Sequence, residues 1–225
     1  METKKTGKIE KIAKGRFMVS AAAAGDSGDT AVTCRLPDGS QAFILSDGMG
    51  KGMKAAAESQ AVINKLRKLL KEGSSVAYAI KEVNRIMIEQ SGKEENFATI
   101  DLAIIDKQTG RAKFYKMGAA LSFLVRGNKI RRIQRPALPV GIIPSLKLTN
   151  VTAKLKPGDV LIMVSDGITE ADRSDLSARW LEEYLVANAQ VMGPRVLAGK
   201  IVSEAQLRYG DRETDDLTVV VGKIE

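Results

Sequence analysis

The sequence contains no histidine, and this absence excludes several kinds of active site. Histidine is the base in Ser-His-Asp and Cys-His systems, a common zinc ligand, and the carrier of the phosphoryl group in phosphohistidine enzymes. The one cysteine, Cys34, is followed six positions later by Ser40 and not by arginine, so a phosphate-cradling cysteine phosphatase is excluded too. If the chain is an enzyme, its chemistry depends on carboxylates and on metal ions that prefer oxygen ligands.

Disulfides, aromatic residues and long apolar runs are also scarce. A single cysteine excludes a disulfide framework and fits a reducing compartment. Only 4% of the residues are aromatic, so a stacking surface for single-stranded nucleic acid is poorly supplied, and we expect no nucleic-acid partner despite the net charge of +8. The basic side chains are then a solvated surface, or they steer an acidic or phosphorylated partner toward the site.

No apolar run reaches the roughly 18 residues that a membrane-spanning helix needs. The N-terminal stretch from Met1 to Lys14 is charged and polar, unlike a signal peptide. We therefore expect a cytoplasmic chain that makes no membrane contact of its own.

The length of 225 residues and the hydrophobic content of 44% suit a single domain over residues 1–225. Apolar spacing predicts one helix from about Lys51 to Lys71, a second that begins after Ser74 or Ser75 and ends near Gly92, and a helical block over 171–209 that is broken near Gly193. Alternating or continuous apolar runs predict strands over 16–24, 31–36, 41–46, 97–106, 111–116, 121–126, 129–133, 148–155, 159–165 and 217–224.

Short turns join most of these strands, so the sheets should be mostly antiparallel, with the helices grouped in pairs outside them. The predicted fold class is therefore α+β, as a four-layer α-β-β-α sandwich of two mostly antiparallel sheets flanked by helix pairs. Residues 135–144 hold three of the six prolines and are predicted to form an ordered loop.

One stretch, Ser46-Asp47-Gly48-Met49-Gly50-Lys51-Gly52, connects the apolar run 42–45 to the first predicted helix. An aspartate at a strand end followed by glycine suits a hard cation, and an aspartate that caps the next helix is the alternative. The tripeptide occurs again as Ser165-Asp166-Gly167 after the apolar run 161–164. Two buried strands that end in the same tripeptide are hard to explain by helix capping alone.

Two further acidic positions lie at strand starts. Asp215 and Asp216 precede the apolar run 217–221, and Asp29 precedes the strand-like run 31–34. If these strands are neighbours, four carboxylates converge at one sheet edge, and such a cluster repels itself unless cations neutralise it. The sequence therefore predicts a metal site built from loop-end carboxylates.

Five motifs resemble one family in their order along the chain. They are Ser-Gly-Asp-Thr at 27–30, Ser-Asp-Gly-Met-Gly-Lys-Gly at 46–52, Leu-Pro-Val-Gly at 138–141, Ser-Asp-Gly-Ile at 165–168 and Asp-Asp-Leu-Thr-Val-Val-Val at 215–221. Together they resemble the metal-dependent protein serine/threonine phosphatases of type 2C. The Ser-Asp-Gly-Met-Gly form and the segment Phe-Ala-Thr-Ile-Asp-Leu at 97–102 are most similar to the stage II sporulation protein E group.

The resemblance implies an α-β-β-α sandwich that holds two manganese or magnesium ions and activates a bridging water. It assigns Asp47 as the bridging carboxylate, the Gly48 carbonyl as a further ligand of the first ion, and Asp166 and Asp215 as ligands of the second ion. Asp29 matches the N-terminal acidic ligand, which in this family acts partly through water. The resemblance places Asp26, Asp216, Ser46 and Ser165 beside the ligands, and Arg16 is a candidate for phosphate binding.

The resemblance also implies the substrate and the partners. The substrate would be a phosphoserine of a small anti-anti-sigma factor, whose dephosphorylation frees a sigma factor in sporulation. The two helices at 51–91, joined to the first tripeptide through Gly50 and Gly52, would act as a switch set by an upstream regulatory region. Relatives are often tethered to a membrane upstream, in which case this chain would be their cytosolic part. Both a monomer and a homodimer remain open.

Two alternatives belong to other classes. A nucleotide-binding protein would use Gly48, Gly50 and Gly52 against phosphate, but Met53 occupies the position of the last glycine of G-x-G-x-x-G. A catalytically weak or inactive phosphatase-fold protein would only bind and regulate partners, although the presence of all four carboxylates argues against it.

Overall fold

The computed structural model describes residues 17–24, 27–50, 52–90, 96–172, 174, 177–212 and 214–225. The chain divides into two compact units. The central unit comprises residues 28–119 and 134–154. The terminal unit comprises the described residues up to Ser27, residues 120–133, and those from Leu155 to the end.

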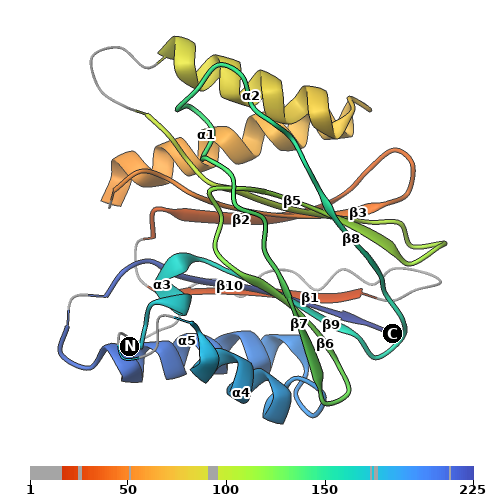
Figure 1. The fold of residues 1–225 in the computed structure, drawn as a ribbon, viewed down its shortest axis with the longest axis vertical. Coiled ribbons are helices and arrows are strands. Elements are labelled where there is room, and N and C mark those ends of the chain that lie inside the picture. Colours follow the sequence, from red (N-terminus) through yellow and green to blue (C-terminus); the bar gives the residue numbers. More distant parts are fainter. Residues whose placement is uncertain are drawn as a thin grey trace. The chain divides into compact units, whose positions relative to one another are not determined.

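The central unit is an antiparallel sheet with two helices on one face (Figure 1). Its strand order is β2-β3-β4-β5-β8, and every neighbouring pair is antiparallel. The strands are β2 (Asp29–Arg35), β3 (Gln41–Asp47), β4 (Ile100–Ile105), β5 (Arg111–Met117) and β8 (Val151–Lys154), and the helices are α1 (Gly52–Lys71) and α2 (Val76–Gln90).

The helices lie on this sheet because their predicted apolar stripes are buried against alternate strand residues. Val62 and Leu66 of α1 and Ile80 of α2 belong to one cluster with Ala42 and Ile44 of β3. Since side chains alternate across a strand, the odd-numbered residues of β3 lie on the opposite sheet face. Complete burial of a residue such as Leu66 contributes about 1.5–3 kcal/mol.

The terminal unit is a second antiparallel sheet, with order β1-β10-β9-β6-β7. Its strands are β1 (Phe17–Ala24), β6 (Ser122–Arg126), β7 (Lys129–Ile133), β9 (Val160–Val164) and β10 (Leu217–Ile224). The helices α4 (Arg179–Asn188) and α5 (Pro194–Tyr209) lie on one face of it (Figure 1). The one-turn helix α3 (Asp166–Thr169) follows β9 and contributes Ile168 to the same core. The first described strand and the last strand of the chain pair along their whole length.

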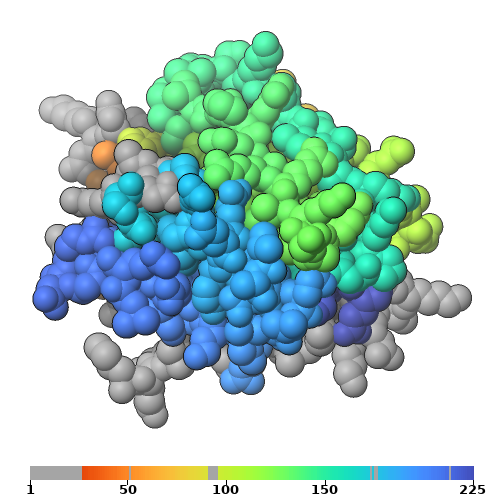
Figure 2. All heavy atoms as spheres, turned by 60° about the horizontal axis from the view of Figure 1, so that its bottom comes forward, coloured from red at the N-terminus to blue at the C-terminus, as the bar shows by residue number. Residues whose placement is uncertain are grey.

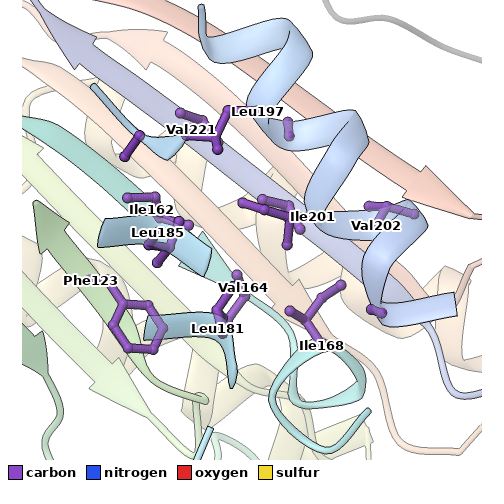
Figure 3. Packing of buried hydrophobic residues seen from close by; sticks show 14 of the residues in the cluster. Phe123, Ile162, Val164, Ile168, Leu181, Leu185, Leu197, Ile201, Val202 and Val221 are labelled. Carbon is purple, nitrogen blue, oxygen red and sulfur yellow. The ribbon is translucent and has the colours of Figure 1, made fainter. Parts of the chain in front are cut away.

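The core of the terminal unit fills the space between α4, α5 and the sheet. Figure 3 shows Leu181 and Leu185 of α4 and Ile201 of α5 packed with Ile162 and Val164 of β9. All five side chains are at most 1% exposed. The outer surface of α4 and α5 is seen as the blue spheres in Figure 2.

The predicted elements are confirmed, with differences at four places. In the helical block predicted over 171–209, the first helix, α4, begins only at Arg179. A one-turn helix, α3, begins at Asp166, so the second Ser-Asp-Gly enters a helix that the sequence analysis did not predict. The predicted strand over 148–155 is shortened to β8. The predicted strand over 97–106 is shortened to β4, and Ala98 before it forms only isolated bridges, to Gly48 and to Val140 of the proline-rich loop.

None of the helices in the described part of the chain combines the length and the apolarity that a membrane span requires.

An ion pair is buried on the face of the central sheet opposite to α1 and α2. Lys116 of β5 lies directly opposite Asp101 of β4, its Nζ is 2.6 Å from the Asp101 Oδ2, and both side chains are at most 1% exposed. Burial lowers the pKa of the Lys116 ammonium, and the charge and hydrogen bond of Asp101 partly offset that effect. The Lys116 charge is therefore stabilised inside the sheet by its Asp101 partner.

We expect Lys116→Met to lower the free energy of unfolding by about 3–5 kcal/mol, because the Asp101 carboxylate stays buried without its counter-charge. The double variant Lys116→Met/Asp101→Leu should recover most of this loss, since no charge is then buried. Urea titration followed by circular dichroism measures both values. Equal stability of the single variant and the parent would contradict a requirement for the ion pair.

Candidate metal centre

Two of the predicted carboxylates lie side by side in the central unit. Asp29, the first residue of β2, and Asp47, the last residue of β3, are directly opposite each other in the antiparallel ladder. Direct cross-strand partners have Cβ atoms about 4.5–5.5 Å apart, and like charges in this arrangement are destabilising. Both residues are partly exposed, although the two carboxylate oxygens of Asp29 are themselves covered by protein atoms.

Gly48 is required where the chain leaves β3 because α1 packs directly against it. A Cβ atom at position 48 would lie 2.0 Å from the backbone oxygen of Ala55, a separation that no side chain could tolerate. The next glycines, Gly50 and Gly52, have φ values of +84° and +77°, which turn the chain into α1. The capping alternative is not supported for Asp47, since α1 begins only at Gly52.

Ser46 and Thr99 fix the backbone on both sides of Asp47. The Ser46 hydroxyl, which is fully buried, donates to the carbonyl of Thr99 at 2.7 Å. The Asp47 N–H donates to the Thr99 hydroxyl at 2.9 Å, and the Thr99 N–H donates to the Asp47 carbonyl at 2.8 Å. Ser46 was predicted to lie beside the ligands, whereas Thr99 was not singled out.

The Leu-Pro-Val-Gly motif supports this corner from the other side. Val140 exchanges two backbone hydrogen bonds with Ala98, the residue before Thr99, at 3.1 and 3.0 Å. A Cβ atom at Gly141 would lie 2.2 Å from the Asn96 backbone oxygen, so glycine is needed for this close approach. Asn84, a buried residue of α2, accepts from the Gly141 N–H at 2.8 Å and donates to the carbonyl of Ile143 at 2.9 Å.

The second Ser-Asp-Gly is fixed in a related way in the terminal unit. The Ser165 hydroxyl donates to the Asp216 carbonyl at 3.0 Å and accepts from the Thr218 N–H at 2.9 Å. The Ser165 N–H also donates to the Thr218 carbonyl at 3.0 Å. These contacts join the end of β9 to the start of β10, where Asp215 and Asp216 lie.

Gly167 again admits a neighbouring backbone. A Cβ atom there would lie 2.3 Å from the Asp216 backbone oxygen and 3.1 Å from the Asp215 Cβ. The phenol of Tyr209, at the end of α5, donates to the Gly167 carbonyl at 3.0 Å. Burial and then the nearby Asp215 charge raise the pKa of Tyr209, so it remains a neutral donor.

The electrostatics of Asp166 favour a cation. Its pKa is raised, first because crowding by protein atoms weakens the hydration of the carboxylate, and then because the charges of Asp215 and Glu170 are near. Asp166 also has exposed surface, so water screens part of this repulsion. Glu170 is a further acidic neighbour that the sequence did not indicate, because only the turn of α3 brings it close.

The predicted residues are thus gathered as two pairs, one in each unit. Asp29 lies with Asp47 and Gly48, and Asp166 lies with Asp215, while Asp216 contributes its carbonyl to Ser165. Among the described residues, no group of three or more His, Cys, Asp and Glu side chains is close enough to hold a metal ion. Asp26 and Arg16 lie outside the described residues.

The residues present fit a hard divalent cation in their chemistry. Each pair offers carboxylate oxygens, which magnesium and manganese prefer, and the chain has no histidine to favour zinc. In each pair two negative charges are held together by backbone hydrogen bonds and by glycines that admit a neighbouring chain segment. A cation would relieve both repulsions.

The chain was compared with known protein families and structures. Residues 37–225 match the family model of stage II sporulation protein E (SpoIIE). The chain is 35% identical over 199 residues to stage II sporulation protein E of Priestia megaterium, covering 88% of this chain and 34% of that protein. It is 24% identical over 189 residues to the phosphoserine phosphatase RsbU of Bacillus subtilis, covering 80% of this chain and 54% of that protein.

Among solved structures, the chain is similar to the PP2C phosphatase domain, with a fragment of the regulatory domain, of the cell fate determinant SpoIIE from Bacillus subtilis. The TM-score is 0.83 and the identity 34%, over 94% of this chain and 64% of that chain. This similarity confirms the predicted α+β fold class with two antiparallel sheets and helix pairs. The chain spans about a third of the Priestia megaterium protein and about half of RsbU. It belongs to the SpoIIE family and comprises that family's PP2C-type phosphatase domain.

Proposed function

We propose that this chain is a metal-dependent protein serine/threonine phosphatase that hydrolyses phosphoserine, and that its two units form one catalytic domain. The observation that carries the proposal is the pair of acidic side chains at a strand end in each unit, Asp29 with Asp47 and Asp166 with Asp215. Membership of a PP2C-type phosphatase family supports the assignment.

The four carboxylates and the Gly48 carbonyl would hold two manganese or magnesium ions. Such ions lower the pKa of a bound water toward about 7 and offset the charge of the phosphoryl oxygens. The chain's own part is to keep the carboxylates in place, to which Gly48 and Gly167 contribute by admitting a neighbouring backbone segment. Ser46 and Ser165 bond to backbone groups, so they hold strands together and are not nucleophiles. No phosphoenzyme is therefore expected.

We propose a phosphorylated anti-anti-sigma factor as the substrate, in sporulation signalling. Family membership supports this substrate class, as does the name of RsbU as a phosphoserine phosphatase. The net charge of +8 would steer a phosphorylated, acidic protein toward the domain. The relatives are much longer than this chain, in keeping with a regulatory region that acts on it.

We further propose that the position of α1 sets the metal affinity. The buried Ser59 hydroxyl of α1 donates to the carbonyl of Gly28, the residue before Asp29, at 2.5 Å, and lies 2.7 Å from the Thr30 hydroxyl. Ala55 of the same helix touches Gly48. A shift of α1 would therefore move the backbone next to both Asp29 and Asp47.

Asp47→Asn should reduce manganese-dependent release of phosphate from a phosphoserine protein by at least about a hundredfold, because the bridging charge is lost while the side-chain shape is kept. A phosphate-release assay measures the rate, and circular dichroism checks the fold. Asp38→Asn, in the exposed turn between β2 and β3, is the matched control and should keep the parental rate. Unchanged turnover in Asp47→Asn would contradict the assignment.

Ser59→Ala should raise the manganese concentration for half-maximal activity by about five- to tenfold, since a hydrogen bond worth about 1–1.5 kcal/mol no longer holds α1 to Gly28, the residue before Asp29. The rate at saturating manganese should stay near the parental value. Ser203→Ala, on the exposed side of α5, serves as the control. An unshifted manganese titration for Ser59→Ala would rule out this coupling.

Asp166→Asn should be more stable than the parent in EDTA at pH 7, because the substitution removes the charge that burial, Asp215 and Glu170 disfavour. The folded-state pKa of Asp166 is raised, so the folded protein binds this proton more tightly than the unfolded chain does. The loss of folding free energy caused by the ionised carboxylate therefore diminishes as the pH falls through that pKa. The stability difference should therefore shrink on acidification. Urea unfolding at pH 7 and pH 5 measures it, and a less stable variant at pH 7 would contradict the repulsion.

A further inference from the structure

Thr99 occupies a place where the regular sheet hydrogen bonding is interrupted. The ladder between β3 and β4 is regular from Gln41 opposite Ile105 to Leu45 opposite Asp101. By the same register Asp47 lies opposite Thr99, and Gly48 indeed bridges to Ala98. Between Asp47 and Thr99, hydrogen bonds of two side-chain hydroxyls replace one of the two backbone hydrogen bonds.

The exchange of partners is specific. In a regular antiparallel pair the Asp47 N–H would donate to the Thr99 carbonyl. Here the Ser46 hydroxyl occupies that carbonyl at 2.7 Å, and the Asp47 N–H donates to the Thr99 hydroxyl at 2.9 Å. The Thr99 N–H still donates to the Asp47 carbonyl at 2.8 Å. Both backbone polar groups of Asp47 are therefore held by one residue.

We propose that Thr99 is a positioning residue of the phosphatase site, which fixes the Asp47 backbone and thereby the direction of its carboxylate. This inference rests on the proposed function, because it takes Asp47 as a metal ligand. Thr99 acts through Asp47 and has no direct contact with substrate in this role. Its hydroxyl is needed as an acceptor, and its branched side chain limits the rotamers from which it can accept.

The second tripeptide supports this assignment independently. There the Ser165 hydroxyl donates to the Asp216 carbonyl and accepts from the Thr218 N–H. Beside Asp166, too, a side-chain hydroxyl accepts a hydrogen bond from a strand N–H. There the hydroxyl belongs to the serine before the aspartate and the N–H to the neighbouring strand. In both tripeptides these hydroxyl hydrogen bonds lie next to the aspartate and the glycine that follows it.

Thr99 is itself held firmly enough to position another residue. Ala98 before it pairs with Val140 through two backbone bonds, and Ile100 after it is fully buried in β4. The Val140 loop is in turn bonded to Asn84 of α2 through Gly141. A change of the Thr99 hydroxyl alone should therefore alter Asp47 without moving the strand.

The test compares Thr99→Val, which keeps the shape and removes the acceptor, with Thr99→Ser, which keeps the acceptor. Thr33→Val, a partly buried strand residue of the same sheet, is the matched control. Calorimetric titration with manganese chloride gives the affinity, a phosphate-release assay with a phosphoserine protein gives kcat and KM, and urea unfolding gives the stability. Asp47→Asn is measured alongside.

We expect Thr99→Val to weaken manganese binding by about tenfold, as is typical when a partner that orients a ligand is lost. Thr99→Ser and Thr33→Val should stay within about threefold of the parent, and KM should change less than the manganese affinity. If Thr99→Val does not fold, Ser46→Ala tests the same exchange of partners and should weaken manganese binding in the same direction.

The outcomes separate this inference from the proposed function. Parental manganese affinity in a folded Thr99→Val, together with lost binding in Asp47→Asn, would overturn the role of Thr99 and leave the function standing. A loss of stability without a change of affinity would also overturn it, because it would show a structural role only. A parent that neither binds manganese nor releases phosphate would refute the proposed function and this inference with it.

Discussion

The close approach of a second backbone segment to the residue after each central aspartate is the constraint on which the candidate site depends. At Gly48 the segment is the first turn of α1, and at Gly167 it is the chain at Asp216. In both places a Cβ atom would lie within about 2.3 Å of a backbone oxygen, so the position admits only glycine. The aspartate before each glycine is thereby placed where two chain segments meet, which are close in sequence at Gly48 and distant in sequence at Gly167.

The candidate site brings negative charges close together, and their repulsion lowers the stability of the metal-free protein. Asp29 faces Asp47 across a ladder, and the pKa of Asp166 is raised by burial and by Asp215. The two hydrophobic cores offset this loss of stability, since the side chains on the helix-facing sides of both sheets are almost entirely buried. Such a conflict between local electrostatics and stability is expected at a functional site.

Periodicity and turn chemistry in the sequence were sufficient to predict most of the fold. The apolar spacing predicted α1, and the short connection between the strands predicted over 31–36 and 41–46 indicated the β2-β3 hairpin, because both signals are local. The pairing of β1 with β10 was not predictable in this way, since it joins strands at opposite ends of the chain. The one-turn helix α3 was missed because four residues carry no helical period.

The candidate site was predictable in its acidic residues and in the serines and glycines of the two Ser-Asp-Gly tripeptides. A repeated Ser-Asp-Gly can be read directly from the sequence, and so can the carboxylates before β2 and β10. Thr99 and Asn84 carry no such signal, because a threonine in a strand and an asparagine in a helix are ordinary until the fold shows their partners. The alternation of β4 and β5 likewise gave no reason to expect a buried Asp101 opposite Lys116.

Thr99 and Asn84, together with the predicted Ser46 and Ser165, share a physical role that explains why a chain without histidine can still build a precise site. Carboxylates at strand ends are flexible unless the backbone that carries them is fixed. Here hydroxyl and amide side chains fix the backbone, because they form hydrogen bonds with backbone groups that have no partner in the regular sheet ladders at the strand ends. Because these side chains bond backbone groups and not the carboxylates, the oxygens of Asp47 and Asp166 need not be shared with Ser46, Thr99 or Ser165. The fold thus separates the groups that hold the site together from the groups that would bind the ions.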